Sequence, residues 1–354
     1  MSAVLRTVLW SLFIASSLLG GVSQQQQQQQ TDAKCTRRTM SCTGKTPVAV
    51  NRVTDHFIGK RTYKLFIPPT YSHSVPAPVI LSFHGRTKTA DHQLALDQLT
   101  SPIFNNDSIV VYPNGLNNTW EGVPLVTTDD RGFTAAILDA LEHDHCVDTA
   151  RVFATGKSQG GGFVGQLACD PVLSRRITAF APVAGAFYID HNNLTHRTTN
   201  SNLAFADDDD GKQKKLSRCA PEEMETPCAP GRRKIPIIAF QGGADQIIPY
   251  GGGPRRRGCL PAIPHWVRGW AARNGLDARR NVSRGLGAGS EAVVYEFGEG
   301  SERGLVTHVY CGDRVGHSWP STRANADSDK NGDGAAGFNA SAVMVAFFAR
   351  WSLC

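Results

Sequence analysis

The chain has 354 residues, with 37 lysines and arginines against 31 aspartates and glutamates, which gives a formal net charge of +6. The basic clusters at Arg232 and Arg255 lie in proline- and glycine-rich stretches without interleaved aromatic residues, so the composition does not favour a nucleic-acid-binding protein. The length is ordinary for one α/β domain, and neither an internal repeat nor a linker divides it.

Residues 1–23 have the pattern of a secretory signal peptide. One arginine precedes an apolar stretch from Val8 to Leu19, and small residues follow it. This stretch is shorter than the roughly 20 residues that cross a bilayer core, so a membrane anchor is not expected. Residues 24–34 contain a glutamine tract and are expected to form a disordered leader. The folded domain is therefore expected over residues 35–354.

Cysteines and glycosylation motifs agree with an extracellular location. The chain has nine cysteines, so we expect disulfides with one cysteine left over. Five Asn-X-Ser/Thr motifs are typical of a protein that passes through a glycosylating secretory pathway. They lie at Asn106, Asn117, Asn193, Asn281 and Asn339. These features predict a secreted, disulfide-bonded glycoprotein.

Short apolar runs that end in glycine, proline or a polar turn predict strands. Several are continuous rather than alternating, as expected for strands that are covered on both faces. The runs lie at residues 63–69, 78–85, 108–115, 151–156, 177–185, 235–245 and 305–312.

Helical patterns lie between these runs. Residues 131–145 place Phe133, Ile137 and Leu141 on one helical face. Residues 159–169 are rich in small residues that allow close packing on a sheet, and residues 341–351 close the chain with a further helix. The alternation predicts an α/β fold, with a mostly parallel central sheet flanked by helices.

Residues 190–233 interrupt this alternation. The segment is polar, contains four consecutive aspartates at 207–210, and includes Cys219 and Cys228. We expect an insertion at the rim of the sheet. Two interpretations stay open: the insertion forms a lid over a site, or it is a surface loop without a role in a site.

The pentapeptide Gly156-Lys157-Ser158-Gln159-Gly160 matches the G-x-S-x-G motif. Between a strand and a helix, this motif places the serine on a strained corner, and the flanking glycines avoid a steric clash. The start of the helix then favours a developing negative charge. Because the preceding run predicts a strand and the following one a helix, Ser158 is a candidate nucleophile rather than a structural turn residue.

A serine nucleophile needs a histidine base that a carboxylate orients. Asp245 directly follows a predicted buried strand, and His317 lies in the loop after the last one, in the order that α/β-hydrolases use. Asp313 is the competing candidate for the acid, and Asp245 could instead cap its own turn. His308 lies within a strand pattern and is expected to be a packed core residue.

An oxyanion hole needs two donors. The backbone amide of Gln159, which follows the nucleophile, is the first candidate. The second is expected from the loop after an earlier strand, where His84 begins a tight turn. The amide of Arg86 or that of Thr87 can serve, and the sequence does not separate them; His84 itself is expected to shape the loop.

These motifs resemble those of secreted fungal feruloyl esterases, closest to the type C group, among carbohydrate esterases and polyester depolymerase-like α/β-hydrolases. The stretches that carry the resemblance are FHG at Phe83, YPNGLNNTW from Tyr112, CVD at Cys146, RVFATGKSQGGGF around Ser158, LACDP at Cys169, FAPVAGAFY from Phe180, GGADQIIPY around Asp245 and GHSWP at His317. The resemblance implies a single α/β-hydrolase catalytic domain that hydrolyses hydroxycinnamoyl esters on the arabinose of plant cell-wall polysaccharide. It also implies that Trp120 lies near the substrate, although a structural role is equally open.

The resemblance further implies a set of disulfides. The implied pairs are Cys146–Cys169, Cys259–Cys311 and Cys42–Cys228. These pairs leave Cys35, Cys219 and Cys354 unassigned. A pair between Cys219 and Cys228 across a short loop is the alternative to the third.

Two metal-like patterns have simpler interpretations, so neither a metal nor a cofactor is expected. His143 and His145 close a predicted helix, where histidine complements the negative end of the helix dipole. The stretch from Asp327 has calcium-ligand spacing, but Phe338 stands where a bidentate glutamate is needed. We interpret it as a glycine-rich loop, with weak calcium binding as the lesser alternative.

The main hypothesis is a serine esterase whose partner is feruloylated wall polysaccharide or oligosaccharide. A second hypothesis keeps the reaction and exchanges the substrate for acetylxylan or polyhydroxybutyrate. A third is a non-catalytic wall-binding protein, which the complete set of triad residues disfavours.

Overall fold

The computed structural model describes residues 42–45, 48–190, 203–207, 213–217, 219–287, 290–331 and 335–353. All of them belong to one compact unit, Arg38–Leu353. The predicted signal peptide and leader, together with Asn193, Cys35 and Cys354, lie outside the described residues. None of the described helices is long and apolar enough to cross a membrane.

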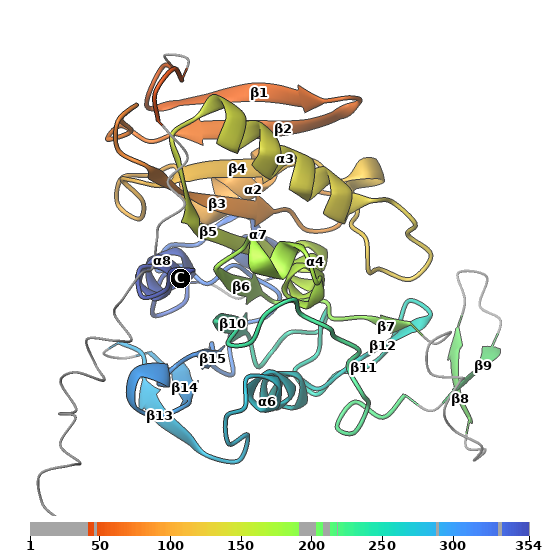
Figure 1. The fold of residues 1–354 in the computed structure, drawn as a ribbon. Coiled ribbons are helices and arrows are strands. Elements are labelled where there is room, and N and C mark those ends of the chain that lie inside the picture. Colours follow the sequence, from red (N-terminus) through yellow and green to blue (C-terminus); the bar gives the residue numbers. More distant parts are fainter. Residues whose placement is uncertain are drawn as a thin grey trace, which may run out of the picture. The chain divides into compact units, whose positions relative to one another are not determined.

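Ten of the described strands form one large mixed sheet (Figure 1). Its order is β1 (Arg52–Ile58), β2 (Arg61–Ile67), β4 (Ile109–Pro113), β3 (Ala77–Phe83), β5 (Val147–Lys157), β6 (Ala179–Val183), β10 (Ile237–Gln241), β15 (Val306–Tyr310), β14 (Val293–Phe297) and β13 (Asn281–Gly285). The six inner strands from β4 to β15 are parallel, and the outer pairs are antiparallel. The predicted, mostly parallel sheet is confirmed.

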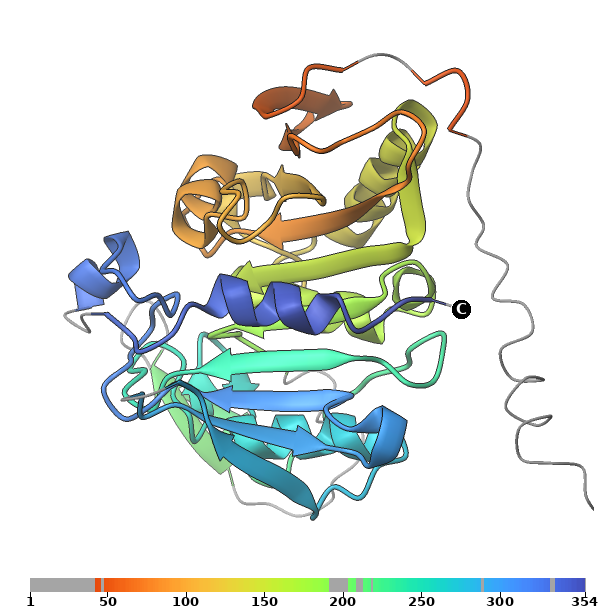
Figure 2. The same cartoon turned by 90° about the vertical axis from the view of Figure 1, so that its left-hand side faces the viewer.

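Helices cover both faces of this sheet, because each presents an apolar side to it. One hydrophobic cluster holds the inner sides of α3 (Asp130–Asp144), α4 (Gln159–Cys169) and α6 (Ile263–Arg273). A second cluster, on the opposite face, holds those of α2 (Ala90–Asp97) and α8 (Ala340–Phe348). Figure 2 looks onto the face that α8 crosses. The three helices predicted from the sequence are thus α3, α4 and α8, and the molecule has three layers.

Smaller elements lie outside the large sheet. A three-stranded sheet has the order β11 (Gly253–Arg255), β12 (Gly258–Leu260) and β7 (Ile189–Asp190), and a hairpin is formed by β8 (Leu203–Asp207) and β9 (Gln213–Ser217). The short helices are α7 (Ala326–Asn331), η1 (Leu116–Asn118), η2 (Leu173–Arg175) and η3 (Gly300–Glu302). The predicted insertion at 190–233 therefore contains the β8–β9 hairpin and a part that lies outside the described residues.

The disulfide pairs implied by the family resemblance are wrong. The structure instead pairs Cys42 with Cys146, Cys169 with Cys228, and Cys219 with Cys259. Their Cα atoms are 4.9, 4.8 and 5.5 Å apart, within the usual range for a disulfide.

The arrangement of the elements explains the difference. Cys311, at the end of β15, is a buried free thiol in the cluster beneath α8. Cys259 lies in a separate small cluster with Met224, so these two cysteines cannot meet. Cys169 ends α4 and bonds to Cys228 in the segment after the insertion hairpin, which leaves neither of them for Cys42 or Cys146.

Candidate active site

Ser158 occupies a strained turn between β5 and α4. Its backbone angles, φ 57° and ψ −116°, are unfavourable for a residue with a side chain. A Cβ at Gly160 would lie 2.2 Å from the carbonyl oxygen of Phe83, and one at Gly156 would lie 2.7 Å from the same oxygen. Glycines at both positions therefore let α4 approach β3 closely. The turn presents the Ser158 hydroxyl at the carboxyl edge of the sheet, at the first turn of α4.

The structure brings the three predicted triad residues together. The Ser158 hydroxyl lies 2.9 Å from Nε2 of His317, and Nδ1 of His317 lies 2.8 Å from Oδ2 of Asp245. In the tautomer that completes this chain, Nδ1–H donates to Asp245 and the Ser158 hydroxyl donates to Nε2. The imidazole is thereby positioned to accept the serine proton.

Asp245 is fixed in place by hydrogen bonds to both carboxylate oxygens. Oδ1 accepts from the backbone amides of Ile247 and Ile248, at 2.8 and 2.7 Å, and Oδ2 accepts from Nε2 of Gln241 at 2.9 Å. The competing acid, Asp313, is exposed and accepts from the Tyr310 hydroxyl instead. The geometry thus favours Asp245 as the partner of His317.

The surroundings of His317 favour its neutral imidazole over the protonated form. Burial lowers the pKa of His317 below the ordinary 6.5, and the hydrogen bond to Asp245 opposes this shift only in part. The Lys157 cation lowers the pKa further, and the Asp327 anion raises it. His317 therefore remains available as a base at mildly acidic pH.

A buried ion pair beside the triad was not predicted from the sequence. Nζ of Lys157, the residue before Ser158, lies 2.6 Å from Oδ2 of Asp327 on α7, and both side chains are almost fully buried. Burial lowers the pKa of Lys157, while Asp327 opposes that shift. The sequence indicates only that a lysine lies inside the G-x-S-x-G motif. It does not indicate that this lysine pairs with Asp327, which lies far along the chain.

Hydrogen bonds distinguish the two candidates for the second oxyanion donor, the backbone amides of Arg86 and Thr87. The amide of Thr87 donates to the carbonyl oxygen of Asn118 at 2.8 Å. Among the described residues, neither the backbone amide of Arg86 nor that of Gln159 donates to a backbone or side-chain acceptor. Both residues line the pocket of Ser158. The geometry therefore favours Arg86 over Thr87 as the second donor.

Trp120 is a structural residue, so the expectation that it contacts substrate is wrong. Its side chain is fully buried, and its indole nitrogen donates to the carbonyl oxygen of His84 at 2.7 Å. The ring stacks on Phe163 of α4. His84 is also buried, accepts from the Gly115 amide, and has its pKa lowered by burial to about 4. Both residues hold the oxyanion loop against α4, as expected for His84.

The metal-like patterns do not assemble a site in the part of the chain that is described, where no cluster of three or more potential ligands occurs. His143 is exposed at the end of α3, with Nδ1 2.7 Å from the Asp144 carboxylate. Asp327 is engaged by Lys157, and residues 332–334 of the proposed calcium loop lie outside the described residues. His308 is fully buried in the core beside Tyr250, as expected.

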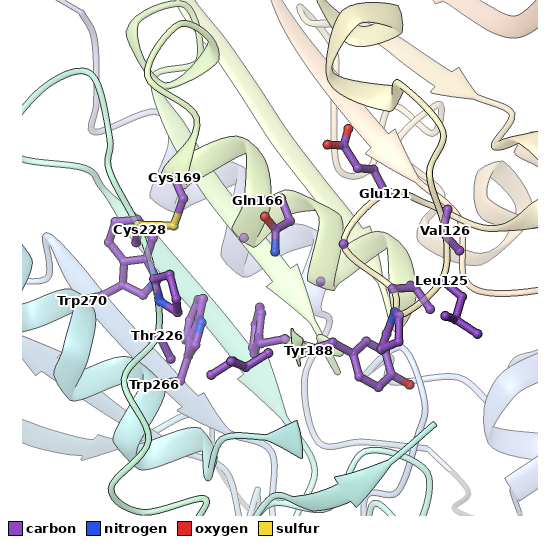
Figure 3. A pocket seen from close by; sticks show the side chains of 18 of the residues that line it. Glu121, Leu125, Val126, Gln166, Cys169, Tyr188, Thr226, Cys228, Trp266 and Trp270 are labelled. Atoms are coloured by element: carbon purple, nitrogen blue, oxygen red, sulfur yellow. A yellow bond between two sulfur atoms is a disulfide. The ribbon is translucent and has the colours of Figure 1, made fainter. Parts of the chain in front are cut away.

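Two pockets share Tyr188 as a lining residue. One, of about 260 Å³, contains Ser158 and His317 and is also lined by Ile248. The other, of about 510 Å³, contains no triad residue and is lined by aromatic side chains, among them Tyr188 and Trp266 (Figure 3).

No protein-family model matches this chain. Among curated proteins, the chain is similar to the probable feruloyl esterase C of Aspergillus niger, with 36% identity over 132 residues, or 36% of this chain and 47% of that protein. The feruloyl esterase C of Emericella nidulans shows the same identity and coverage. The matched segment thus spans about half the length of these relatives. The predicted resemblance to fungal feruloyl esterases is confirmed.

A solved acetyl xylan esterase from Aspergillus awamori has a similar structure. The two align over 80% of this chain and 98% of that one, with a TM-score of 0.51 and 13% sequence identity. The chain has an α/β-hydrolase fold. At this identity the likeness concerns the fold alone, and the predicted fold class is confirmed.

Proposed function

We propose that the protein is a serine esterase that hydrolyses feruloyl and related hydroxycinnamoyl esters on arabinose side chains of plant cell-wall polysaccharide. The observation that carries this proposal is the hydrogen-bonded chain from Ser158 through His317 to Asp245, with the serine in a strained turn at the start of a helix. The similarity to proteins named feruloyl esterase supports the choice of acyl group.

The geometry supports an acyl-enzyme mechanism. His317 accepts the Ser158 proton as Oγ attacks the ester carbonyl carbon, and Asp245 stabilises the resulting imidazolium. The amides of Gln159 and Arg86 donate to the carbonyl oxygen as its negative charge develops. The imidazolium of His317 then donates its proton to the sugar oxygen as the bond to the carbonyl carbon breaks, so that the sugar leaves with a free hydroxyl. Water, activated by the same histidine, cleaves the acyl-enzyme and releases the carboxylic acid.

We further propose that the protein acts outside the cell. The signal-like segment at residues 1–23 and the five glycosylation motifs support this location. Of the four motifs in the described part of the chain, Asn106, Asn117 and Asn281 have exposed asparagines, as attachment of a glycan requires, whereas Asn339 is half-buried and its side chain accepts from the Thr322 amide.

A comparison of ester substrates tests the proposed function. We expect kcat/KM on methyl ferulate to exceed that on acetylated xylan or a short hydroxybutyrate oligomer by at least about tenfold, since the acyl groups differ by an entire aromatic ring. Release of ferulate from feruloylated arabinoxylan should accompany it. A preference for acetylated xylan or for the oligomer would instead support the corresponding alternative esterase.

The pH profile of kcat/KM should reflect the lowered pKa of His317. The base must be neutral to accept the serine proton, and a lowered pKa keeps it neutral to lower pH. Activity should therefore fall on acidification with a midpoint below 6.5, the ordinary pKa of histidine. Initial rates on methyl ferulate between about pH 4 and 8 measure this midpoint. A midpoint at or above 6.5 would contradict the assigned environment.

A further inference from the structure

Basic side chains surround the nucleophile. The pocket that contains Ser158 is lined by four of them, Arg86, Lys88, Arg255 and Arg256, in addition to Lys157. An adjoining pocket of about 250 Å³ shares Arg86 and Arg256 and adds Arg257. Arg86 and Arg256 therefore line both the pocket of Ser158 and the adjoining pocket.

These charges lack acidic partners within the described part of the chain. The one carboxylate that lines the pocket of Ser158 is Asp327, and Lys157 already binds it. None of Arg86, Lys88, Arg255 and Arg256 lies within ion-pair distance of a described carboxylate. Nε of Arg255 is buried and has no hydrogen-bond partner. A buried donor without a partner favours an acceptor supplied by a ligand.

Three of the arginines line the same pocket as Tyr188 and Ser158, namely Arg86, Arg255 and Arg256. Burial raises the pKa of Tyr188, and the charges of these arginines, together with a side-chain hydrogen bond from Arg255, oppose that shift. The pocket that contains the nucleophile therefore has positively charged walls.

The backbone holds two of these arginines in an unfavourable conformation. Arg256 and Arg257 connect β11 to β12 and have φ angles of 47° and 59°, where asparagine or glycine is usual in a two-residue hairpin. The hairpin is anchored by the disulfide of Cys259 to Cys219 and by pairing of β12 with β7. Strain of this kind is typical of functional sites.

We propose that this pocket selects esters whose alcohol part carries a carboxylate, such as hydroxycinnamoyl esters on or beside a uronic acid residue of an acidic polysaccharide. This inference rests on the proposed function, because the hydroxycinnamoyl group is uncharged and the negative charge must then lie on the sugar. Arginine matches the planar carboxylate with two parallel hydrogen bonds, which favours carboxylate as the recognised group. The overall positive charge attracts such a polymer.

Two matched esters test this inference: the feruloyl ester of methyl galacturonide and the feruloyl ester of methyl galactoside, acylated on the same hydroxyl. We expect kcat/KM of the wild type to be about tenfold higher for the acidic ester. The double variant Arg255→Gln, Arg256→Gln should bring the ratio close to one. Arg279→Gln, which removes an exposed arginine outside the three pockets, should keep the wild-type ratio.

A second measurement uses the wild type alone and does not depend on folding of the variant. Raising the salt concentration should weaken the preference for the acidic ester and leave the rate on the neutral ester nearly constant. Equal rates on both esters, insensitive to salt, would overturn the inference and leave the proposed function standing. A stronger preference for the matching sugar phosphate ester would overturn the assignment to carboxylate. Failure to hydrolyse these two esters while methyl ferulate is hydrolysed would overturn this inference alone, and failure on methyl ferulate as well would overturn the proposed function and this inference with it.

Discussion

Replacement of Ser158 by alanine should lower kcat on methyl ferulate by a factor on the order of 10⁶, with little change in KM. The hydroxyl 2.9 Å from Nε2 of His317 is the atom that would form the acyl-enzyme, and no other group in the turn replaces it. The pocket around it stays intact, so substrate binding should persist. Initial rates and a melting curve measured on the same sample separate loss of chemistry from loss of folding.

A matched serine gives the control for this variant. Ser301 is exposed in η3 and lines none of the three pockets, so Ser301→Ala should keep wild-type kcat. A Ser158→Ala protein that is folded and retains wild-type turnover would show that another residue is the nucleophile.

Replacement of Asp245 by asparagine should lower kcat by a factor on the order of 10⁴, because the amide no longer holds the imidazole in the productive tautomer. The Asp245 carboxylate accepts the proton of Nδ1 at 2.8 Å and stabilises the imidazolium that forms during attack. Asparagine has nearly the same shape and can keep the amide bonds from Ile247 and Ile248. The expected loss is therefore electrostatic, and kcat on methyl ferulate measures it.

Asp313→Asn is the matched control, since both residues were candidates for the acid. Asp313 is exposed and bonded to the hydroxyl of Tyr310, so its replacement should leave kcat close to that of the wild type. A large loss in Asp313→Asn together with a small one in Asp245→Asn would reverse the assignment of the acid.

The central strands could be predicted because strands that are buried on both faces have continuous apolar sequences. Every residue of β3, β4, β6 and β10 is buried, and each of these strands lies within a continuous apolar run. The edge strands β1 and β13 are mostly exposed, so their sequences carry little apolar pattern. Pairing with β2 and β14 holds them in the sheet, and such pairing cannot be derived from the sequence of one strand.

The candidate site likewise has features that could be predicted from the sequence and features that could not. Ser158, Asp245 and His317 could be predicted because each follows a recognisable strand, in an order that the fold imposes. The Lys157–Asp327 pair could not, because it depends on where α7 lies above the sheet. The choice between Arg86 and Thr87 likewise depended on the carbonyl of Asn118, which comes from another loop.

Trp120 and the disulfides show the limit of inference from resemblance. A tryptophan in a loop near the carboxyl edge can face a substrate or the core, and only the hydrogen bond to the His84 carbonyl decides between them. The pairing of Cys42 with Cys146 depends on the path of the chain before β1, which spacing does not record.

Covalent labelling with a serine-directed fluorophosphonate tests whether Ser158 is the nucleophile of an esterase. We expect one adduct per chain, mapped by peptide mass spectrometry to Ser158, that blocks hydrolysis of methyl ferulate and is absent in Ser158→Ala. A folded wild-type protein that forms no adduct, or that is labelled at another serine while Ser158 stays unmodified, would contradict this assignment.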